Sequence, residues 1–346
     1  MYRKIMGFLE AWKDSVHRKP LILQGARQVG KTYSILEFGR THYENVAYFN
    51  FETNPKLNET FEENISPDYL IPILSHIAGQ TIVTEKTLIV FDEVQLCERA
   101  LTSLKYFCEN APDYHIIVAG SLLGVAVNRA KFSFPVGKVD MKTLYPMDME
   151  EFMLALGEDD LVEQIKKCFQ TDTPLPSALH DAAMQLYRQY LVVGGMPECV
   201  MQFAETKDYI LVRHTQDTIL ASYLNDMSKY NNLNEIKKTR LAYDNITVQL
   251  SKKNTRFQYK LMKKGGRASE FENAIEWLCL SGIVSQVYKV EQIKKPLENY
   301  RDIDAFKIYV SDLGLLCAKK DLAANDILYI CLLYTSPSPR DTERSR

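Results

Sequence analysis

The sequence has no uninterrupted apolar stretch of the roughly 18–20 residues that a membrane-spanning helix needs. It also has no Cys-x-x-Cys pair, and its 7 cysteines lie at long, irregular intervals. Such a set is typical of reduced thiols and excludes a disulfide framework. The segment from Met1 to Gly7 lacks the apolar region of a secretory signal. We therefore expect a cytoplasmic protein with no membrane partner.

An excess of charge of one sign is missing as well. The chain has 42 Lys and Arg against 44 Asp and Glu, a net charge of −2. This excludes a chain that is basic or acidic throughout, although it leaves room for a local basic patch. With 346 residues, of which 46% are apolar, the chain is long enough for two or three domains with their own cores.

Four short, continuously apolar runs alternate with segments of helical spacing in the first 120 residues. Such runs are typical of strands that are buried on both faces of a sheet. They are residues 21–23, 46–51, 87–91 and 115–119, and residues 137–144 are a candidate fifth strand. The alternation predicts an α/β fold with a parallel sheet that is covered by helices on both sides.

A glycine-rich loop follows the first of these strands and precedes a helix. It matches the Walker A pattern G-x-x-x-x-G-K-[ST] with the residues Gly25, Ala26, Arg27, Gln28, Val29, Gly30, Lys31 and Thr32. Such a P-loop turns its backbone N–H groups toward phosphate oxygens, and the following helix adds positive potential. Lys31 would reach the β- and γ-phosphates of ATP, and the Thr32 hydroxyl would bind Mg²⁺. The alternative is a glycine-rich turn with a surface lysine.

The third apolar run ends in two adjacent carboxylates, Asp92 and Glu93. The carboxyl end of a parallel strand lies in the crevice where such sheets bind ligands, so Asp92 can hold Mg²⁺ there, in the manner of a Walker B motif. Glu93 can then polarise an attacking water. A solvated loop is the alternative. Because a kinase of small metabolites has no need for a water-activating acid beside the metal, Glu93 favours ATP hydrolysis over transfer to a metabolite.

Polar residues follow the fourth apolar run. Ser121 can touch the γ-phosphate and sense its presence, or it is a plain turn residue. Arg129 could reach the nucleotide of a neighbouring subunit in a homo-oligomer, but a solvated surface arginine is the simpler interpretation. The same two alternatives apply to Lys138.

Helical spacing dominates after residue 150. A helix over 268–280 is followed by two strand-like segments, which favours a winged helix-turn-helix. Residues 229–301 carry 15 Lys and Arg against 7 Asp and Glu. Nine of these cations surround the predicted motif: Lys237, Lys238, Arg240, Lys252, Lys253, Arg256, Lys263, Lys264 and Arg267. They could bind DNA phosphates in a salt-dependent way, or form a solvated face.

Short runs along most of residues 1–320 resemble the prokaryotic AAA-type ATPases that carry an uncharacterised C-terminal domain. The runs are residues 24–32, 48–52, 91–95, 120–121, 144–152, 190–197, 225–230 and 309–316. The resemblance implies a three-layer ASCE-type sheet with strand order 5-1-4-3-2, which would place Ser121 between the two nucleotide motifs. It also implies a mainly helical second half with a winged-helix section. Members of this family typically continue into a nuclease-like domain, which we expect to be missing here.

The expected organisation has four parts. We expect an ATPase domain at 1–155, a helical linker or lid at 156–205, a winged-helix domain at 206–320 and a truncated end at 321–346. Residues 331–346, rich in Ser, Pro and Arg, resemble a translated sequencing adapter and are expected to be a non-native tail. The expected function is an ATPase that couples nucleotide state to a C-terminal region that binds DNA or another partner. The alternative is a nucleotide-switched DNA-binding adaptor with negligible hydrolysis.

Overall fold

The computed structural model describes residues 1–120, 135–229, 233–252, 256–263 and 266–328. Ser121, Arg129 and the segment 331–346 therefore lie outside the described residues. In the described part of the chain, no helix combines the length and the apolar character that crossing a membrane requires.

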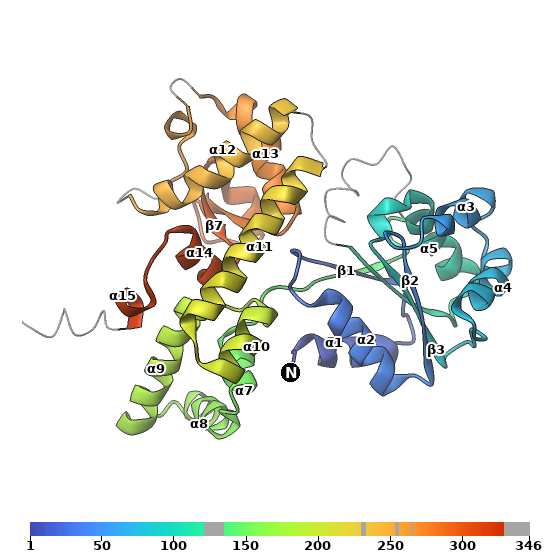
Figure 1. Ribbon diagram of the computed structural model, residues 1–346, viewed down its shortest axis with the longest axis horizontal. Coiled ribbons are helices and arrows are strands. Elements are labelled where there is room, and N and C mark those ends of the chain that lie inside the picture. The colour runs from blue at the N-terminus through green and yellow to red at the C-terminus, as the bar shows by residue number, and fades with distance from the viewer. Residues whose placement is uncertain (121–134, 230–232, 253–255, 264–265, 329–346) are drawn as a thin grey trace, which may run out of the picture. The chain divides into compact units, whose positions relative to one another are not determined.

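A five-stranded parallel sheet organises the first part of the chain (Figure 1). Its strands are β1 (Leu21–Gln24), β2 (Asn45–Asn50), β3 (Thr87–Asp92), β4 (His115–Ala119) and β5 (Asp140–Thr143). They lie in the order β2-β3-β4-β1-β5, and every neighbouring pair is parallel. This confirms the predicted parallel sheet and, counted from the other edge, the order 5-1-4-3-2.

Helices cover both faces of this sheet, as Figure 1 shows. They are α1 (Ile5–Lys13), α2 (Lys31–His42), α3 (Lys56–Glu63), α4 (Pro67–Ala78) and α5 (Glu98–Asn110), with a 3₁₀ turn η1 at Val94–Leu96. On one face α2 lies so close that a Cβ at Gly39 would come within 2.5 Å of Val46 Cγ2. On the other face the rings of Phe61 in α3 and Phe91 in β3 meet with centroids 5.6 Å apart. The three-layer prediction is confirmed.

The carboxyl ends of β1 and β3 lie at the same edge of the sheet, with β4 between them. The glycine-rich loop leaves β1 at this edge, and Asp92 is the last residue of β3. Parallel strands bring their C-terminal residues together in this way, which makes the edge the usual ligand-binding crevice of an open α/β sheet. The fold therefore brings the two predicted motifs to one place.

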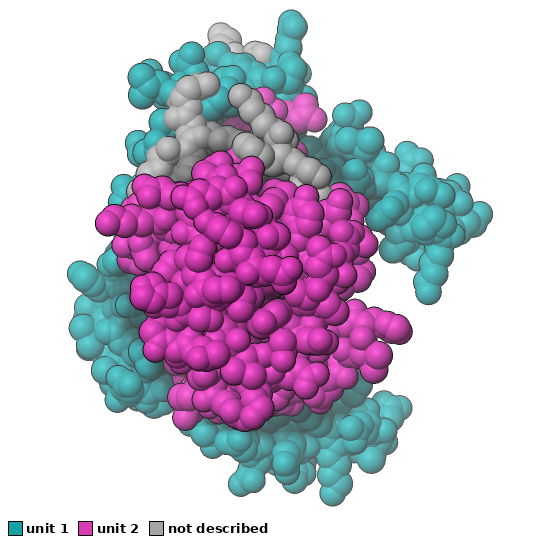
Figure 2. Space-filling model, turned by 90° about the vertical axis from the view of Figure 1, so that its right-hand side faces the viewer, with its two compact units in different colours: residues 1–2, 146–271, 285–346 teal, residues 3–145, 272–284 magenta. Residues whose placement is uncertain are grey.

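Helices dominate the second half. The elements there are α7 (Met149–Ala155), α8 (Asp159–Gln170), α9 (Ser177–Val193), α10 (Pro197–Thr206), α11 (Tyr209–Lys229), α12 (Leu233–Leu250), η2 (Tyr259–Leu261), α13 (Ala268–Leu280), β6 (Val284–Val290), η3 (Leu297–Tyr300), β7 (Arg301–Val310), α14 (Leu313–Lys319) and α15 (Ala324–Leu328). β6 and β7 form a separate two-stranded sheet. Residues 3–145 and 272–284 make up one compact unit, and the other described residues make up a second (Figure 2).

The turn between α9 and α10 is a close junction in which backbone meets backbone. Gly194 ends α9 with a φ of 76°, and Pro197 begins α10. The Gly195 carbonyl accepts a hydrogen bond from Met147 N at 2.7 Å, and the Gly195 N–H donates to Asp312 Oδ2 at 2.6 Å. Asp312 is buried and also accepts from Leu315 N, so it caps α14 from the same position. Gly194 and Gly195 therefore end α9, and the close approach of Met147 and Asp312 leaves no room for a larger residue at Gly195.

Replacing Gly195 with Ala is expected to destabilise the protein by about 3 kcal/mol or more, because overpacking against backbone cannot be relieved by a side-chain rotation. The added Cβ would lie 1.9 Å from the Met147 carbonyl oxygen. Denaturant unfolding measures the change. Gly7→Ala in α1 is the matched control, since a Cβ there meets nothing within 4 Å. Equal stabilities of the Gly195→Ala variant and the wild type would contradict this description of the junction.

Candidate functional site

The glycine-rich loop between β1 and α2 has the backbone that a P-loop requires. Gly25, Gln28 and Gly30 have φ values of 149°, 64° and 87°, so the chain turns repeatedly through the left-handed region before α2 begins at Lys31. Gly25 is required for a second reason: a Cβ on it would lie 2.2 Å from the Leu144 carbonyl oxygen. Ala26 and Val29 are buried, which anchors the loop to the core.

Lys31 is 7% exposed and lies across its own loop. Its ammonium donates to the carbonyl oxygens of Gly25 at 2.9 Å and Ala26 at 2.8 Å. Burial lowers the pKa of Lys31 to about 8, although the nearby carboxylates of Glu93 and Asp92 favour the charged form and Arg27 opposes it.

Asp92 connects the β3 motif to the loop. Its Oδ2 atom accepts a hydrogen bond from Thr32 Oγ1 at 2.8 Å, across 60 residues of sequence. Its Oδ1 atom accepts from the Glu93 N–H at 3.0 Å. Asp92 is 5% exposed, and such a buried carboxylate needs the hydrogen bonds it receives. A threonine hydroxyl beside a carboxylate supplies the hard oxygen ligands that Mg²⁺ prefers, so these two residues fit that ion.

Glu93 follows Asp92 in the left-handed region, with a φ of 51°, and occupies the position just before the 3₁₀ turn η1. Its Oε2 atom accepts a short hydrogen bond from Gln95 Nε2. Glu93 and Asp92 both act electrostatically on Lys31. The sequence-predicted residues Lys31, Thr32, Asp92 and Glu93 are thus gathered at one edge of the sheet, whereas Ser121 lies outside the described residues.

Three residues near this edge had no role in the sequence-based prediction. Tyr48 in β2 donates from its hydroxyl to Asp92 Oδ2 at 2.8 Å. Burial raises the pKa of Tyr48 to about 12, so its hydroxyl remains a donor at ordinary pH. Gln95 holds Glu93, as described above. Arg3 is 4% exposed and donates to the carbonyl oxygens of Val29 at 2.9 Å and Tyr145 at 2.8 Å, which ties the N-terminus to the P-loop.

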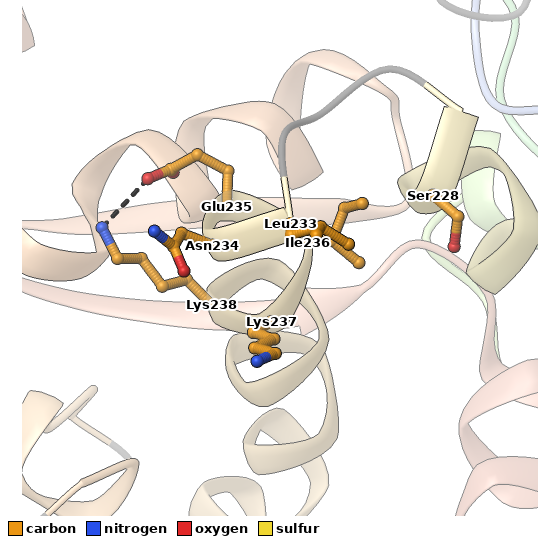
Figure 3. Close-up of a pocket in the computed structure, with 7 residues that line it drawn as sticks. All are labelled: Ser228, Leu233, Asn234, Glu235, Ile236, Lys237 and Lys238. Atoms are coloured by element: carbon orange, nitrogen blue, oxygen red, sulfur yellow. Dashed lines mark hydrogen bonds and ion pairs between the residues drawn. The ribbon is translucent and has the colours of Figure 1, made fainter.

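The predicted basic patch is partly neutralised. Lys238 pairs with Glu235 at 2.9 Å, as Figure 3 shows, and Lys263 pairs with Glu270 at 2.7 Å. Arg240 donates to Ser228 Oγ at 2.7 Å. Three other cations are exposed, namely Lys237, Lys252 and Arg267, while Arg256 donates to the Asp304 carbonyl and Lys253 and Lys264 lie outside the described residues.

A pocket opens at the start of α12, within this basic stretch (Figure 3). It is lined by Ser228 of α11 and by residues 233–238. Two lysines line the pocket. Lys238 is paired with Glu235, and Figure 3 draws no ion pair for Lys237. The pocket shares no residue with the P-loop or β3.

Lys138, the second candidate for a role in a neighbouring subunit's site, pairs with Glu109 at 3.0 Å. Both side chains are partly exposed, and such pairs contribute little to stability. This arrangement supports the simpler interpretation of Lys138 as a surface residue.

Comparisons with known proteins agree with this geometry. Residues 17–153 match the family model described as AAA domain, and residues 184–326 match a domain of unknown function (DUF8612). No protein with a curated description matches the chain.

Solved structures resemble the chain at low sequence identity. The Walker-type ATPase PABY2304 of Pyrococcus abyssi is 13% identical, with a TM-score of 0.56 over 92% of this chain and 95% of that one. The ORC2 protein of Aeropyrum pernix is 12% identical, with a TM-score of 0.45 over 96% of each chain. The RuvB branch migration motor of Thermotoga maritima is 13% identical, with a TM-score of 0.34 over 82% and 87%. The last two likenesses are too loose to carry an argument. Residues 17–153 therefore match the AAA domain family, with the P-loop at residues 25–32, and residues 184–326 match a domain of unknown function.

Proposed function

We propose that the chain binds ATP with Mg²⁺ at the loop 25–32 and hydrolyses it to ADP and phosphate. The observation that carries this proposal is the 2.8 Å hydrogen bond from Thr32 Oγ1 to Asp92 Oδ2. It joins the end of the P-loop to the end of β3, at the edge where parallel sheets bind ligands. The fold shared with a Walker-type ATPase supports the same proposal.

Each residue has a separate role in this proposal. The backbone N–H groups of residues 25–32 and the start of α2 bind the phosphates, and Lys31 neutralises their charge. Thr32 and Asp92 hold Mg²⁺, which neutralises charge on the β- and γ-phosphates. Glu93 orients the attacking water and accepts its proton. Ser121 is proposed to sense the γ-phosphate.

Steady release of phosphate from ATP by the purified protein tests the proposal. The alternative function is a nucleotide-switched adaptor with negligible turnover. The hydrogen bond from Gln95 to Glu93 supports this alternative, because one of the two Glu93 oxygens that could accept a proton from water already has a donor. Tight ATP binding without phosphate release would establish the adaptor. Transfer of labelled phosphate to a small molecule would instead indicate a kinase.

The lowered pKa of Lys31 predicts how the affinity for ATP depends on pH. A lysine with a pKa of about 8 is charged at pH 7 and mostly neutral at pH 9, and phosphate binds only the charged form well. The affinity for ATP should therefore fall by about tenfold from pH 7 to pH 9. Calorimetry at both pH values measures this, with uptake of protons on binding near pH 8. An affinity that is constant up to pH 9 would show that Lys31 does not contribute through its charge.

The second half is proposed to read nucleotide state and to bind DNA or another partner through a winged helix-turn-helix. Support comes from the order α12, η2, α13, β6 and β7, and from the hydrogen bond from Phe257 N to Phe306 O at 2.8 Å, which holds Phe257 beside β7. The exposed side chains of α13 include Glu272 and Glu276, which disfavours contact between this helix and DNA. Among the nine cations predicted around the motif, the exposed Lys237, Lys252 and Arg267 are therefore proposed to contact DNA. Filter binding at increasing salt tests it, since phosphate contacts weaken steeply with salt.

A further inference from the structure

The end of β2 is connected to Asp92, at the edge of the sheet proposed to bind the nucleotide, through a chain of side-chain hydrogen bonds. β2 and β3 are parallel neighbours, with Tyr48 opposite Val90 and Asn50 opposite Asp92. Tyr48 lies 44 residues before Asp92 in sequence, yet its hydroxyl reaches Asp92 Oδ2 at 2.8 Å.

Three donors fix the Asp92 carboxylate. Oδ2 accepts from Thr32 Oγ1 and from Tyr48 Oη, both at 2.8 Å, and Oδ1 accepts from Glu93 N at 3.0 Å. Thr32 lies in the P-loop, and Glu93 N belongs to the adjacent peptide group. Tyr48 is the one donor of these three that comes from β2, and it shares Oδ2 with Thr32.

Asn50 sets the direction in which the Tyr48 hydroxyl donates. Asn50 Nδ2 donates to Tyr48 Oη at 3.2 Å, so the oxygen of that hydroxyl acts as an acceptor there and its proton is left for Asp92. Asn50 is itself held by the loop after β2, because its Oδ1 atom accepts from Glu52 N at 2.9 Å and Thr53 N at 3.0 Å. The backbone of this loop thus fixes the orientation of Asn50, which in turn orients Tyr48.

We infer that Tyr48 is a positioning residue for magnesium: it holds the Asp92 carboxylate in the orientation that accepts the Mg²⁺ of the bound nucleotide. This inference rests on the proposed ATPase function. A hydrogen bond to a charged carboxylate is among the stronger ones, because the acceptor carries a full negative charge. Without the hydrogen bond from Tyr48, the Asp92 carboxylate keeps two donors but rotates more freely about its side-chain bonds. Its orientation must then be fixed each time the ion binds.

The Tyr48 hydroxyl does not contribute to the packing of the core. Tyr48 is 38% exposed, and it does not belong to the apolar cluster that fills the sheet face around Phe49 and Phe91. Removal of its hydroxyl oxygen leaves the ring in place. The Tyr48→Phe variant is therefore expected to fold as the wild type does, and a change in its Mg²⁺ dependence reports on the hydrogen bond to Asp92.

The test is binding of a fluorescent ADP analogue at increasing Mg²⁺ concentration, with the full chain. For Tyr48→Phe, the Mg²⁺ concentration at half-saturation should rise about 5- to 10-fold, while affinity in the absence of Mg²⁺ stays within about twofold of wild type. Tyr69→Phe is the matched control, since the Tyr69 hydroxyl also donates to a carboxylate, Glu63, at the surface of α4. That variant should behave as the wild type in both conditions.

Two results would overturn the inference while leaving the proposed function standing: a Mg²⁺ dependence in Tyr48→Phe equal to that of the wild type, or an equal loss of affinity with and without Mg²⁺. Failure of the wild type to bind the nucleotide under any Mg²⁺ concentration would overturn the proposed function and the role of Tyr48 together. The same titration with Mn²⁺, followed by its electron paramagnetic resonance signal, provides a readout that does not depend on the fluorophore.

Discussion

Replacement of Glu93 with Gln is expected to slow ATP hydrolysis by about 10²- to 10³-fold and to leave ATP binding nearly unchanged. The amide keeps the size and polarity of the side chain but cannot accept a proton from water, and general-base catalysis contributes a factor of this order. The charge of Asp92, the Thr32 hydroxyl and the loop backbone are untouched, so the phosphates and Mg²⁺ keep their partners.

Single-turnover phosphate release and equilibrium ATP binding measure the two effects separately. Glu98→Gln is the matched control, because Glu98 is an exposed residue at the start of α5, five positions along the same chain segment. Turnover by Glu93→Gln at the wild-type rate would show that another group activates the water.

Loss of the Lys31 ammonium, in contrast, is expected to weaken ATP binding itself. Lys31→Met should weaken ATP affinity by at least about 100-fold, since the proposed site uses the Lys31 ammonium to neutralise the charge of the phosphates. In the absence of nucleotide the same change should leave the melting temperature equal or higher. The lowered pKa of Lys31 indicates that burial disfavours its charge, and methionine fills similar space without that cost.

Lys105→Met, an exposed site in α5, is the control for the change of residue type. Fluorescent nucleotide binding and thermal unfolding together distinguish the explanations. A Lys31→Met protein that binds ATP normally would contradict the assignment of the loop as the phosphate site, whereas a protein that is strongly destabilised without nucleotide would contradict the description of Lys31 as a costly buried charge.

The centre of the sheet could be predicted from the sequence because β1, β3 and β4 are short and buried on both faces, whereas the edge strands β2 and β5 are partly exposed. Each of the runs around β1, β3 and β4 is continuously apolar, and all residues of β3 and β4 are indeed buried. The helices of the second half were predicted only coarsely. The sequence indicated a helical linker or lid at 156–205, and within this range the structure has the separate helices α8, α9 and α10.

The two phosphate-binding motifs could also be found, since their residues are contiguous in sequence. Their supporting partners could not. Arg3 donates to Val29 and, across 142 residues, to Tyr145, and Tyr48 reaches Asp92 across the width of one strand. Such contacts depend on the order of strands in the sheet and on where a side chain points, and no periodic pattern in a single sequence encodes them. The basic stretch could be found from its net charge, but the pairing of its cations could not. Lys238 and Lys263 are paired with acids that lie near them in the chain.

The central claim is that the loop 25–32 binds the phosphates of an adenine nucleotide together with Mg²⁺. Isothermal titration calorimetry of the wild-type chain with ADP and Mg²⁺ tests it most directly. The account predicts saturable binding of one nucleotide per chain and its loss in Lys31→Met. Absence of binding heat at several temperatures, in a protein that unfolds cooperatively and is therefore folded, would contradict the account.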